Sequence, residues 1–129
     1  MDDSCIKGIV HYQRDKTGQK QPLNHNKLTC CGDEPYDDCE EKYARDSEWL
    51  LHEAFCLYSE RDIFDPYEKH HSTVKDACEL AEKLNVTNLL LYHTEDRNLA
   101  ARKKIYFEEG SCYYHGNLFI PDDLESIKL

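Results

Sequence analysis

Histidine and carboxylate residues follow several apolar segments of this 129-residue chain, at points where β-strands are expected to end. The clearest example is His93, which follows the apolar run "NLLLY" and precedes Glu95 and Asp96. Comparable positions end other predicted strands or close the loops between them: Asp33, Glu53 and His71. Such side chains, converging from several loops, can assemble a metal site or an acid–base pair.

Each of these positions also has a purely structural explanation. A Gly-Asp pair after a strand is usually a turn, and a histidine before Ser-Thr can simply accompany a helix cap. Acids in the remaining loops fit a solvated surface. His93 favours chemistry most, because its strand is otherwise apolar and its neighbours are acidic. The occurrence of all these positions in one chain favours a functional site.

The first part of the chain is predicted to be largely β structure. Residues Ile6–Tyr12 alternate moderately between apolar and polar, and Asp15–Gly18 ("DKTG") is a turn signal. The segments "KQPL" and "KLTCC" flank Asn24–Asn26, which we expect to form the turn of a hairpin. Acids at the start of Asp37–Asp46 favour a short helix, and Glu48–Cys56 has the length of a strand.

The second part alternates between helix and strand. Residues 58–71 are predicted to form a long surface loop, and residues 72–85 form the clearest helix, with a Thr73–Asp76 capping box. Its apolar face is formed by Val74, Ala77, Cys78, Ala81 and Leu84. A buried strand should cover residues 86–93, because three consecutive leucines suit a sheet that is covered on both faces.

A second helix is expected from Asn98 to Glu109, and Gly110 should end it. Its packed side is predicted to hold Leu99, Ala101, Ile105 and Tyr106. One or two closing strands follow in residues 117–129. Strand, helix, strand, helix, strand is an α/β pattern around a mostly buried sheet.

Composition limits the possible partners. The formal net charge of −10 argues against a nucleic-acid-binding module, because affinity for a polyanion comes from Lys and Arg. No apolar run reaches the length of a membrane span, and the acidic start "MDDSCIKG" lacks the order of a signal peptide, so we expect a cytoplasmic protein. The seven cysteines are then predicted to be reduced, mostly as small core residues, with a structural zinc cluster as the alternative.

Three segments together resemble the ribonuclease Z-like branch of the metallo-β-lactamase-fold hydrolases. "LTCCGD" (Leu28–Asp33) resembles the family's strand followed by Gly-Asp. "WLLHEAFC" (Trp49–Cys56) looks like its His-Glu-Ala-Thr segment, with Phe55 in place of the threonine. The stretch from Glu68 to His93 is similar to its His-Ser-Thr loop, helix and strand. The resemblance covers residues 28–129, which follow a β-hairpin region in residues 1–27.

The resemblance implies an enzyme with metal ligands and a proton-transfer pair. Asp33 would bridge two metal ions and His93 would bind one of them, with zinc the first expectation and manganese the second. Glu53 would orient His71, and His71 could donate a proton to the leaving oxygen. The implied reaction is hydrolysis of a phosphodiester or other ester by a metal-bound hydroxide.

Two departures from the family pattern affect this expectation. The chain lacks the His-x-His-x-Asp-His motif that holds most of the family's metal ligands. His93 is followed by "TEDRN" instead of the Phe-Ser and basic-aromatic residues of tRNA-processing members, which favours a general phosphodiesterase or esterase. We therefore expect a single domain, residues 1–129, that is the C-terminal half of a four-layer αββα sandwich: one mixed sheet with helices on its outer face, inactive or nearly so by itself.

A lone half of this fold would leave an apolar sheet face uncovered. We expect a homodimer or a complementing N-terminal half to cover that face. The alternative function is a non-catalytic remnant or interaction module that binds a partner through the same face. A thiol-based redox protein is disfavoured, because the adjacent Cys30 and Cys31 could pair only with strain.

Overall fold

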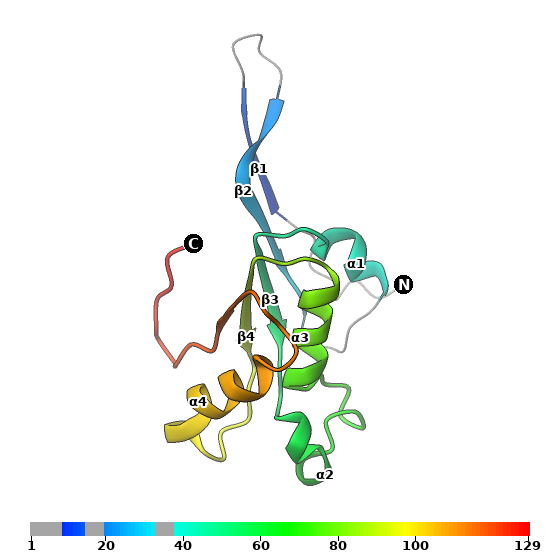
Figure 1. Ribbon diagram of the computed structural model, residues 1–129, viewed down its shortest axis with the longest axis vertical. Coiled ribbons are helices and arrows are strands. Elements are labelled where there is room, and N and C mark those ends of the chain that lie inside the picture. The colour runs from blue at the N-terminus through cyan, green and yellow to red at the C-terminus, as the bar shows by residue number, and fades with distance from the viewer. Residues whose placement is uncertain (1–8, 15–19, 33–37) are drawn as a thin grey trace.

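The computed structural model describes residues 9–14, 20–32 and 38–129, which form one mixed sheet with helices packed against it (Figure 1). The strands are β1 (Ile9–Arg14), β2 (Lys20–Cys30), β3 (Trp49–Glu53), β4 (Asn88–Tyr92) and β5 (Asn117–Phe119). The helices are α1 (Asp38–Ala44), the 3₁₀ helix η1 (Tyr58–Glu60), α2 (Arg61–Phe64), α3 (Val74–Lys83) and α4 (Leu99–Gly110). The predicted α/β class is confirmed.

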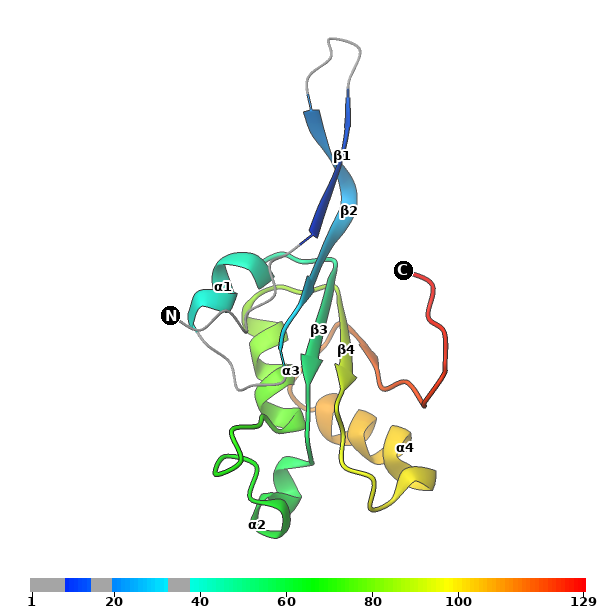
Figure 2. The same ribbon diagram turned by 180° about the vertical axis from the view of Figure 1, so that it is seen from behind.

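The order of the strands in the sheet follows the order of the chain, β1-β2-β3-β4-β5. β1 and β2 are antiparallel, whereas β2, β3, β4 and β5 are parallel to one another. The β1–β2 hairpin projects away from the helices in both views (Figures 1 and 2). Because the parallel strands share one direction, their carboxyl ends, and the polar residues that follow them, lie at one edge of the sheet.

The hairpin turn predicted at Asn24–Asn26 is wrong. These residues lie inside β2, whose pairing with β1 continues on both sides of them, from Tyr12–Pro22 to Ile9–Leu28. An irregularity between Val10 and Tyr12 shifts the register of the pairing at this point. β2 tolerates the polar stretch because it pairs only with β1 there. The turn signal at residues 15–18 lies outside the described residues.

Helix α3 has the predicted capping box and the predicted apolar face. Thr73 Oγ1 accepts a hydrogen bond from the Asp76 backbone N–H at 3.3 Å, and the Asp76 carboxylate accepts one from the Thr73 N–H at 2.9 Å. The whole predicted face is buried: Val74, Ala77, Cys78, Ala81 and Leu84. The pKa of the Cys78 thiol is raised to about 12 by burial, which suits a core residue and opposes thiol chemistry.

The two faces of the sheet differ in burial. Paired residues share a face, so Leu50 and Leu89 form one row, which is fully buried beneath the helices. Leu51, Leu90 and Phe119 form the adjacent row on the opposite face, and they are only partly buried. We call this row the outer sheet face. Figure 2 shows β3 and β4 from that side, with α3 behind them.

The connection between β3 and α3 is more ordered than predicted. Instead of a plain loop, it contains η1 and α2. The Glu109 carboxylate of α4 accepts hydrogen bonds from the Tyr58 and Ser59 N–H groups at 2.6 and 3.2 Å, so a contact distant in sequence stabilises η1. In the described part of the chain, no helix is long and apolar enough to cross a membrane.

Helix α4 ends at Gly110, as predicted, but its packed side differs from the prediction. Leu99 is 52% exposed, whereas Tyr106 is fully buried. A side chain at Gly110 would collide with Leu118, since an added Cβ would lie 2.6 Å from its Cδ2. Gly110 therefore lets α4 pack closely against Leu118 of β5. By helical spacing Leu99 faces the same way as Tyr106, but it is the first residue of α4 and is exposed there.

Candidate functional site

Glu53 ends β3 and holds its carboxylate inside the protein. The residue has no exposed surface. Its Oε2 lies 2.8 Å from His71 Nδ1, and its Oε1 accepts a hydrogen bond from the Ser72 backbone N–H at 2.5 Å. An ionised carboxylate only accepts hydrogen bonds, so His71 Nδ1 is the donor in this pair. Two residues that are 18 positions apart in sequence thus form a histidine–carboxylate pair.

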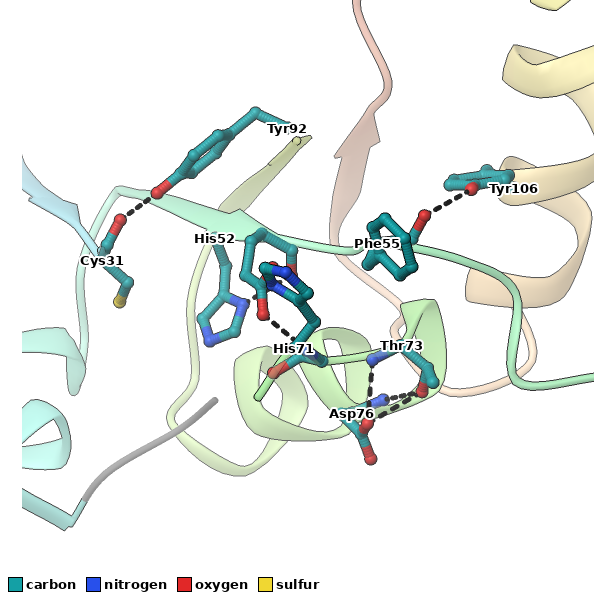
Figure 3. Close-up of polar contacts among 10 residues, drawn as sticks. Cys31, His52, Phe55, His71, Thr73, Asp76, Tyr92 and Tyr106 are labelled. Carbon is teal, nitrogen blue, oxygen red and sulfur yellow. Dashed lines mark hydrogen bonds and ion pairs between the residues drawn. The ribbon is translucent and has the colours of Figure 1, made fainter. Parts of the chain in front are cut away.

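The loop before α3 places His71 over Glu53. The His71 N–H donates to the Pro66 carbonyl at 2.8 Å, which closes a turn at the end of the loop. The imidazole stacks on the Phe55 ring, with ring centroids 4.9 Å apart and an angle of 25° between the ring planes. Figure 3 shows His71 and Phe55 between the end of β3 and the first turn of α3. Stacking and the carboxylate together fix the plane of the imidazole.

His93 lies beside His71, immediately after β4. The two imidazoles stack with centroids 5.1 Å apart and 28° between their planes. The backbone of His93 has φ 55°, in the left-handed region that non-glycine residues rarely adopt. A strained backbone at a strand end is typical of functional sites. The structure therefore brings together three of the predicted residues: Glu53, His71 and His93.

The fourth predicted residue, Asp33, lies outside the described residues, so its role stays a prediction. The chain that leads to it is held at the same sheet edge. The Cys31 N–H donates to the Leu51 carbonyl at 2.8 Å, and the Cys31 carbonyl accepts a hydrogen bond from the Tyr92 hydroxyl. Tyr92 directly precedes His93, so one side chain links the ends of β2 and β4 across β3.

His52 does not join this group, although it precedes Glu53. Successive strand residues point to opposite faces, so His52 lies on the helix side of the sheet and is almost fully buried (Figure 3). Its Nδ1 bonds to the Glu53 carbonyl at 2.8 Å. Burial lowers the pKa of His52 below its ordinary value, which favours a neutral core histidine. His70 is exposed and is likewise outside the group.

Phe55 and Tyr106 contribute contacts that the sequence did not reveal. The Phe55 carbonyl accepts hydrogen bonds from the Glu95 N–H at 2.7 Å and from the Tyr106 hydroxyl at 3.2 Å. Phe55 therefore connects the end of β3 to the loop after His93 and to α4. The only sequence signal was that an aromatic residue follows the His-Glu-Ala segment.

The described residues hold too few donors for a metal centre of their own. Across residues 9–14, 20–32 and 38–129, no group of three or more His, Cys, Asp or Glu side chains is arranged to hold a metal ion. The Nδ1 atom of His71 is engaged by Glu53, and His93 contributes one imidazole. This part of the chain alone therefore does not fit a metal ion, since a catalytic zinc normally has three protein ligands.

Comparison of this chain with solved structures identifies its fold. The metallo-β-lactamase fold protein YhfI from Bacillus subtilis aligns with a TM-score of 0.64 and 14% identity, over 88% of this chain and 46% of that one. The short form of human tRNase Z aligns with a TM-score of 0.59 and 18% identity, over 99% of this chain and 45% of that one. The fold is therefore that of the metallo-β-lactamases, and the chain spans just under half of these neighbours.

Curated relatives narrow the class, although no family model matches the chain. A protein named ribonuclease Z from Thermococcus sibiricus is 29% identical over 124 residues, which are 96% of this chain and 38% of that protein. Ribonuclease Z from Bacillus anthracis is 30% identical over 105 residues, or 81% of this chain and 33% of that protein. The chain is thus a ribonuclease Z-like protein of the metallo-β-lactamase fold. It spans about a third of the length of these relatives.

Proposed function

We propose that this chain contributes to a metal-dependent hydrolase of phosphodiesters or other esters. The observation that supports it most is the 2.8 Å contact between His71 Nδ1 and the fully buried Glu53 carboxylate, beside His93. A histidine oriented by a buried carboxylate is the usual arrangement for proton transfer. His71 is the catalytic acid in this proposal, and Glu53 is its orienting partner.

The chain's own residues would move one proton. Because Nδ1 donates to Glu53, Nε2 is the nitrogen that gives a proton to the leaving oxygen. The carboxylate accepts the hydrogen bond from Nδ1, and the Phe55 ring keeps the imidazole in its plane. His71 is then neutral and regains its proton from water.

The metal would be bound by Asp33 and His93 together with donors from elsewhere. Zinc is the first proposal and manganese the second, because imidazole and carboxylate suit both ions. Asp33 and His93 are too few for a catalytic site, so the missing ligands must come from an N-terminal half or a second copy. The chain's coverage of 33–38% of its curated relatives supports such a completion.

The substrate proposed is a phosphodiester or other ester and not a long RNA. The net charge of −10 leaves little positive surface for a polyanion. Any RNA substrate would need basic surface supplied by the completing segment.

The second candidate function is a non-catalytic interaction module, and one observation favours it. The outer sheet face presents Leu51, Leu90 and Phe119 only partly buried, so an apolar partner could cover it. The two functions differ in whether the site residues matter. An interaction module would keep its binding when His71 and His93 are replaced.

The proposal is tested on the chain co-expressed with the N-terminal half of a relative. Calorimetry measures zinc binding to this complex, and bis(4-nitrophenyl) phosphate is the substrate for its hydrolysis assay. We expect Asp33→Ala and His93→Ala to abolish zinc binding, and Cys31→Ser to preserve it. We expect His71→Ala to retain zinc and lose hydrolysis. Loss of zinc with Cys31→Ser alone would refute the ligand assignment, and unchanged hydrolysis with His71→Ala would refute the proposed acid.

A further inference from the structure

Arg102 lies on the buried face of α4, where an apolar residue would be expected. That face is formed by Arg102, Tyr106 and Gly110, at intervals of one helical turn. Only 8% of Arg102 is exposed, whereas the neighbouring Lys103 and Lys104 are exposed to solvent. Arginine is rarely buried unless its charge and its N–H groups have partners. The burial of Arg102 is therefore explained by the groups that it binds.

The guanidinium group of Arg102 joins the turn after β4 to the segment after β5. Its Nη1 donates a hydrogen bond to Thr94 Oγ1 at 2.8 Å, and its Nη2 donates one to the Pro121 carbonyl at 3.1 Å. A guanidinium group is planar and rigid, so bonds from its two ends fix both partners relative to each other. Thr94 directly follows His93 in the chain. Arg102 therefore holds the turn that carries His93.

The charges around Arg102 compensate one another. Asp122 Oδ1 lies 3.5 Å from Arg102 Nη2, and Asp122 Oδ2 lies 3.4 Å from Lys103 Nζ. The same Lys103 Nζ lies 2.9 Å from a Glu125 carboxylate oxygen. Two cations thus face two anions, which makes Arg102 a poor binding site for an anionic ligand. Arg102 acts on its surroundings through the directions of its hydrogen bonds.

The turn at His93 is not fixed by close packing. The His93 backbone has φ 55°, a conformation that non-glycine residues keep only where the surrounding structure holds them in it. The residue is exposed. A hollow of about 240 Å³ adjoins the turn, and it is lined in part by His93, Thr94, Arg102 and residues 121–123. Hydrogen bonds are therefore the main restraint on this strained turn.

Two hydrogen bonds restrain the residues that follow His93. The Thr94 hydroxyl accepts the bond from Arg102, and the Glu95 N–H donates to the Phe55 carbonyl at 2.7 Å. These bonds pull on the chain from two different elements, α4 and the end of β3. The His93 imidazole, which precedes both residues, stays stacked on the His71 ring, with centroids 5.1 Å apart.

We propose that Arg102 is a positioning residue of the hydrolase, which keeps the His93 imidazole beside His71 by holding Thr94. This inference rests on the proposed hydrolase function. Arg102 donates no proton in the reaction and acts only through the His93 turn. Loss of the Thr94 hydroxyl alone should therefore disturb the stack of the two imidazoles and slow the chemical step, while substrate binding is kept.

Two substitutions of Thr94 separate its hydroxyl group from its shape. Thr94→Val keeps the branched shape and loses the hydroxyl, whereas Thr94→Ser keeps the hydroxyl. NMR of the isotope-labelled full chain records the nuclear Overhauser contact between the ring protons of His71 and His93. We expect this contact in the parent chain and in Thr94→Ser. It should weaken in Thr94→Val and in Arg102→Lys, because lysine keeps the charge but lacks the planar pair of donors. Thr87→Val, at an exposed threonine, is the matched control and should keep the contact.

The rate assay uses the complex with the N-terminal half of a relative and bis(4-nitrophenyl) phosphate as substrate. We expect Thr94→Val to lower kcat by about tenfold to a hundredfold with little change in KM, because a misplacement of about 1 Å can cost that much. Thr94→Ser should restore kcat, and Thr87→Val should not lower it. The melting curve of Thr94→Val should stay cooperative, with a midpoint near that of the parent chain.

An unchanged ring contact or an unchanged kcat in Thr94→Val would overturn the proposal, as would an equal loss in Thr94→Ser or Thr87→Val. Loss of cooperative melting in Thr94→Val would also overturn it, because the hydroxyl would then support the whole fold and not the His93 turn.

The outcomes separate this inference from the function on which it rests. A weakened ring contact in Thr94→Val together with unchanged hydrolysis in His71→Ala would overturn the proposed acid and leave Arg102 as the residue that orients His93. Hydrolysis that depends on His71 but is unchanged in Thr94→Val would overturn the role of Arg102 and leave the hydrolase in place.

Discussion

Replacement of Glu53 by glutamine tests the central geometry of the site. Glutamine keeps the shape of the side chain but removes its charge. The Ser72 N–H is a fixed donor, so the amide oxygen must face it and the amide NH₂ must face His71 Nδ1. His71 must then accept there, and its proton moves from Nδ1 to Nε2. Both hydrogen bonds of the side chain remain but become neutral, so we expect the free energy of unfolding to fall by about 1–3 kcal/mol, the difference between charged and neutral hydrogen bonds.

Nitrogen-15 NMR of the imidazole, at alkaline pH where one ring nitrogen carries the proton, distinguishes the two tautomers. We expect the Nδ1–H form in the parent chain and the Nε2–H form in Glu53→Gln, and urea unfolding measures the stability. Glu79→Gln, which changes a more exposed carboxylate, is the control and should alter neither. An Nε2–H form in the parent chain, or the same tautomer in both proteins, would refute the proposed donor and acceptor roles.

Three other changes test the packing. Ala81→Asp places a carboxylate at a fully buried position of α3 and should unfold the domain. Glu79→Asp, on the exposed side of the helix, is the control and should not. A cooperative melting curve retained by Ala81→Asp would contradict the prediction. Tyr92→Phe removes the hydrogen bond to the Cys31 carbonyl and should lower stability in urea by about 0.5–1.5 kcal/mol; an unchanged midpoint would contradict the link. Burial keeps the pKa of His52 below 6.5, so below that pH the unfolded chain binds more protons than the folded one. The free energy of unfolding should therefore fall between about pH 7 and pH 5 in the parent chain, and fall less in His52→Asn.

Helix α3 shows how much of the fold could be predicted from local sequence. Its cap needs only Thr73 and Asp76, three positions apart, and its buried face follows from helical spacing. The failed hairpin shows the limit of the same reasoning. Asn24–Asn26 has turn-forming residues, but pairing with β1 extends β2 through them. Contacts that are distant in sequence override local preference there.

The candidate site, like the fold, could be predicted from the sequence only in part. Residue types and their positions at strand ends indicate Glu53, His71 and His93 from the sequence alone, and the folded chain brings these three together. We did not predict that His52 faces away from these three residues, although the alternation of side chains along a strand would have allowed that prediction. The stack of Phe55 on His71 was not predictable, because it depends on how the loop before α3 folds back over β3.

The amino-acid sequence was sufficient to predict the alternation of strands and helices, the cap of α3 and the residue types at the sheet edge, since each depends on neighbours within a few positions. Which of those residues meet was decided by the tertiary structure. Tyr92 reaches a carbonyl 61 positions away, and Glu53 pairs with a histidine 18 positions away. Residues so far apart in the sequence come into contact only when the parallel strands are in register, because the sheet then brings the carboxyl ends of the strands to one edge.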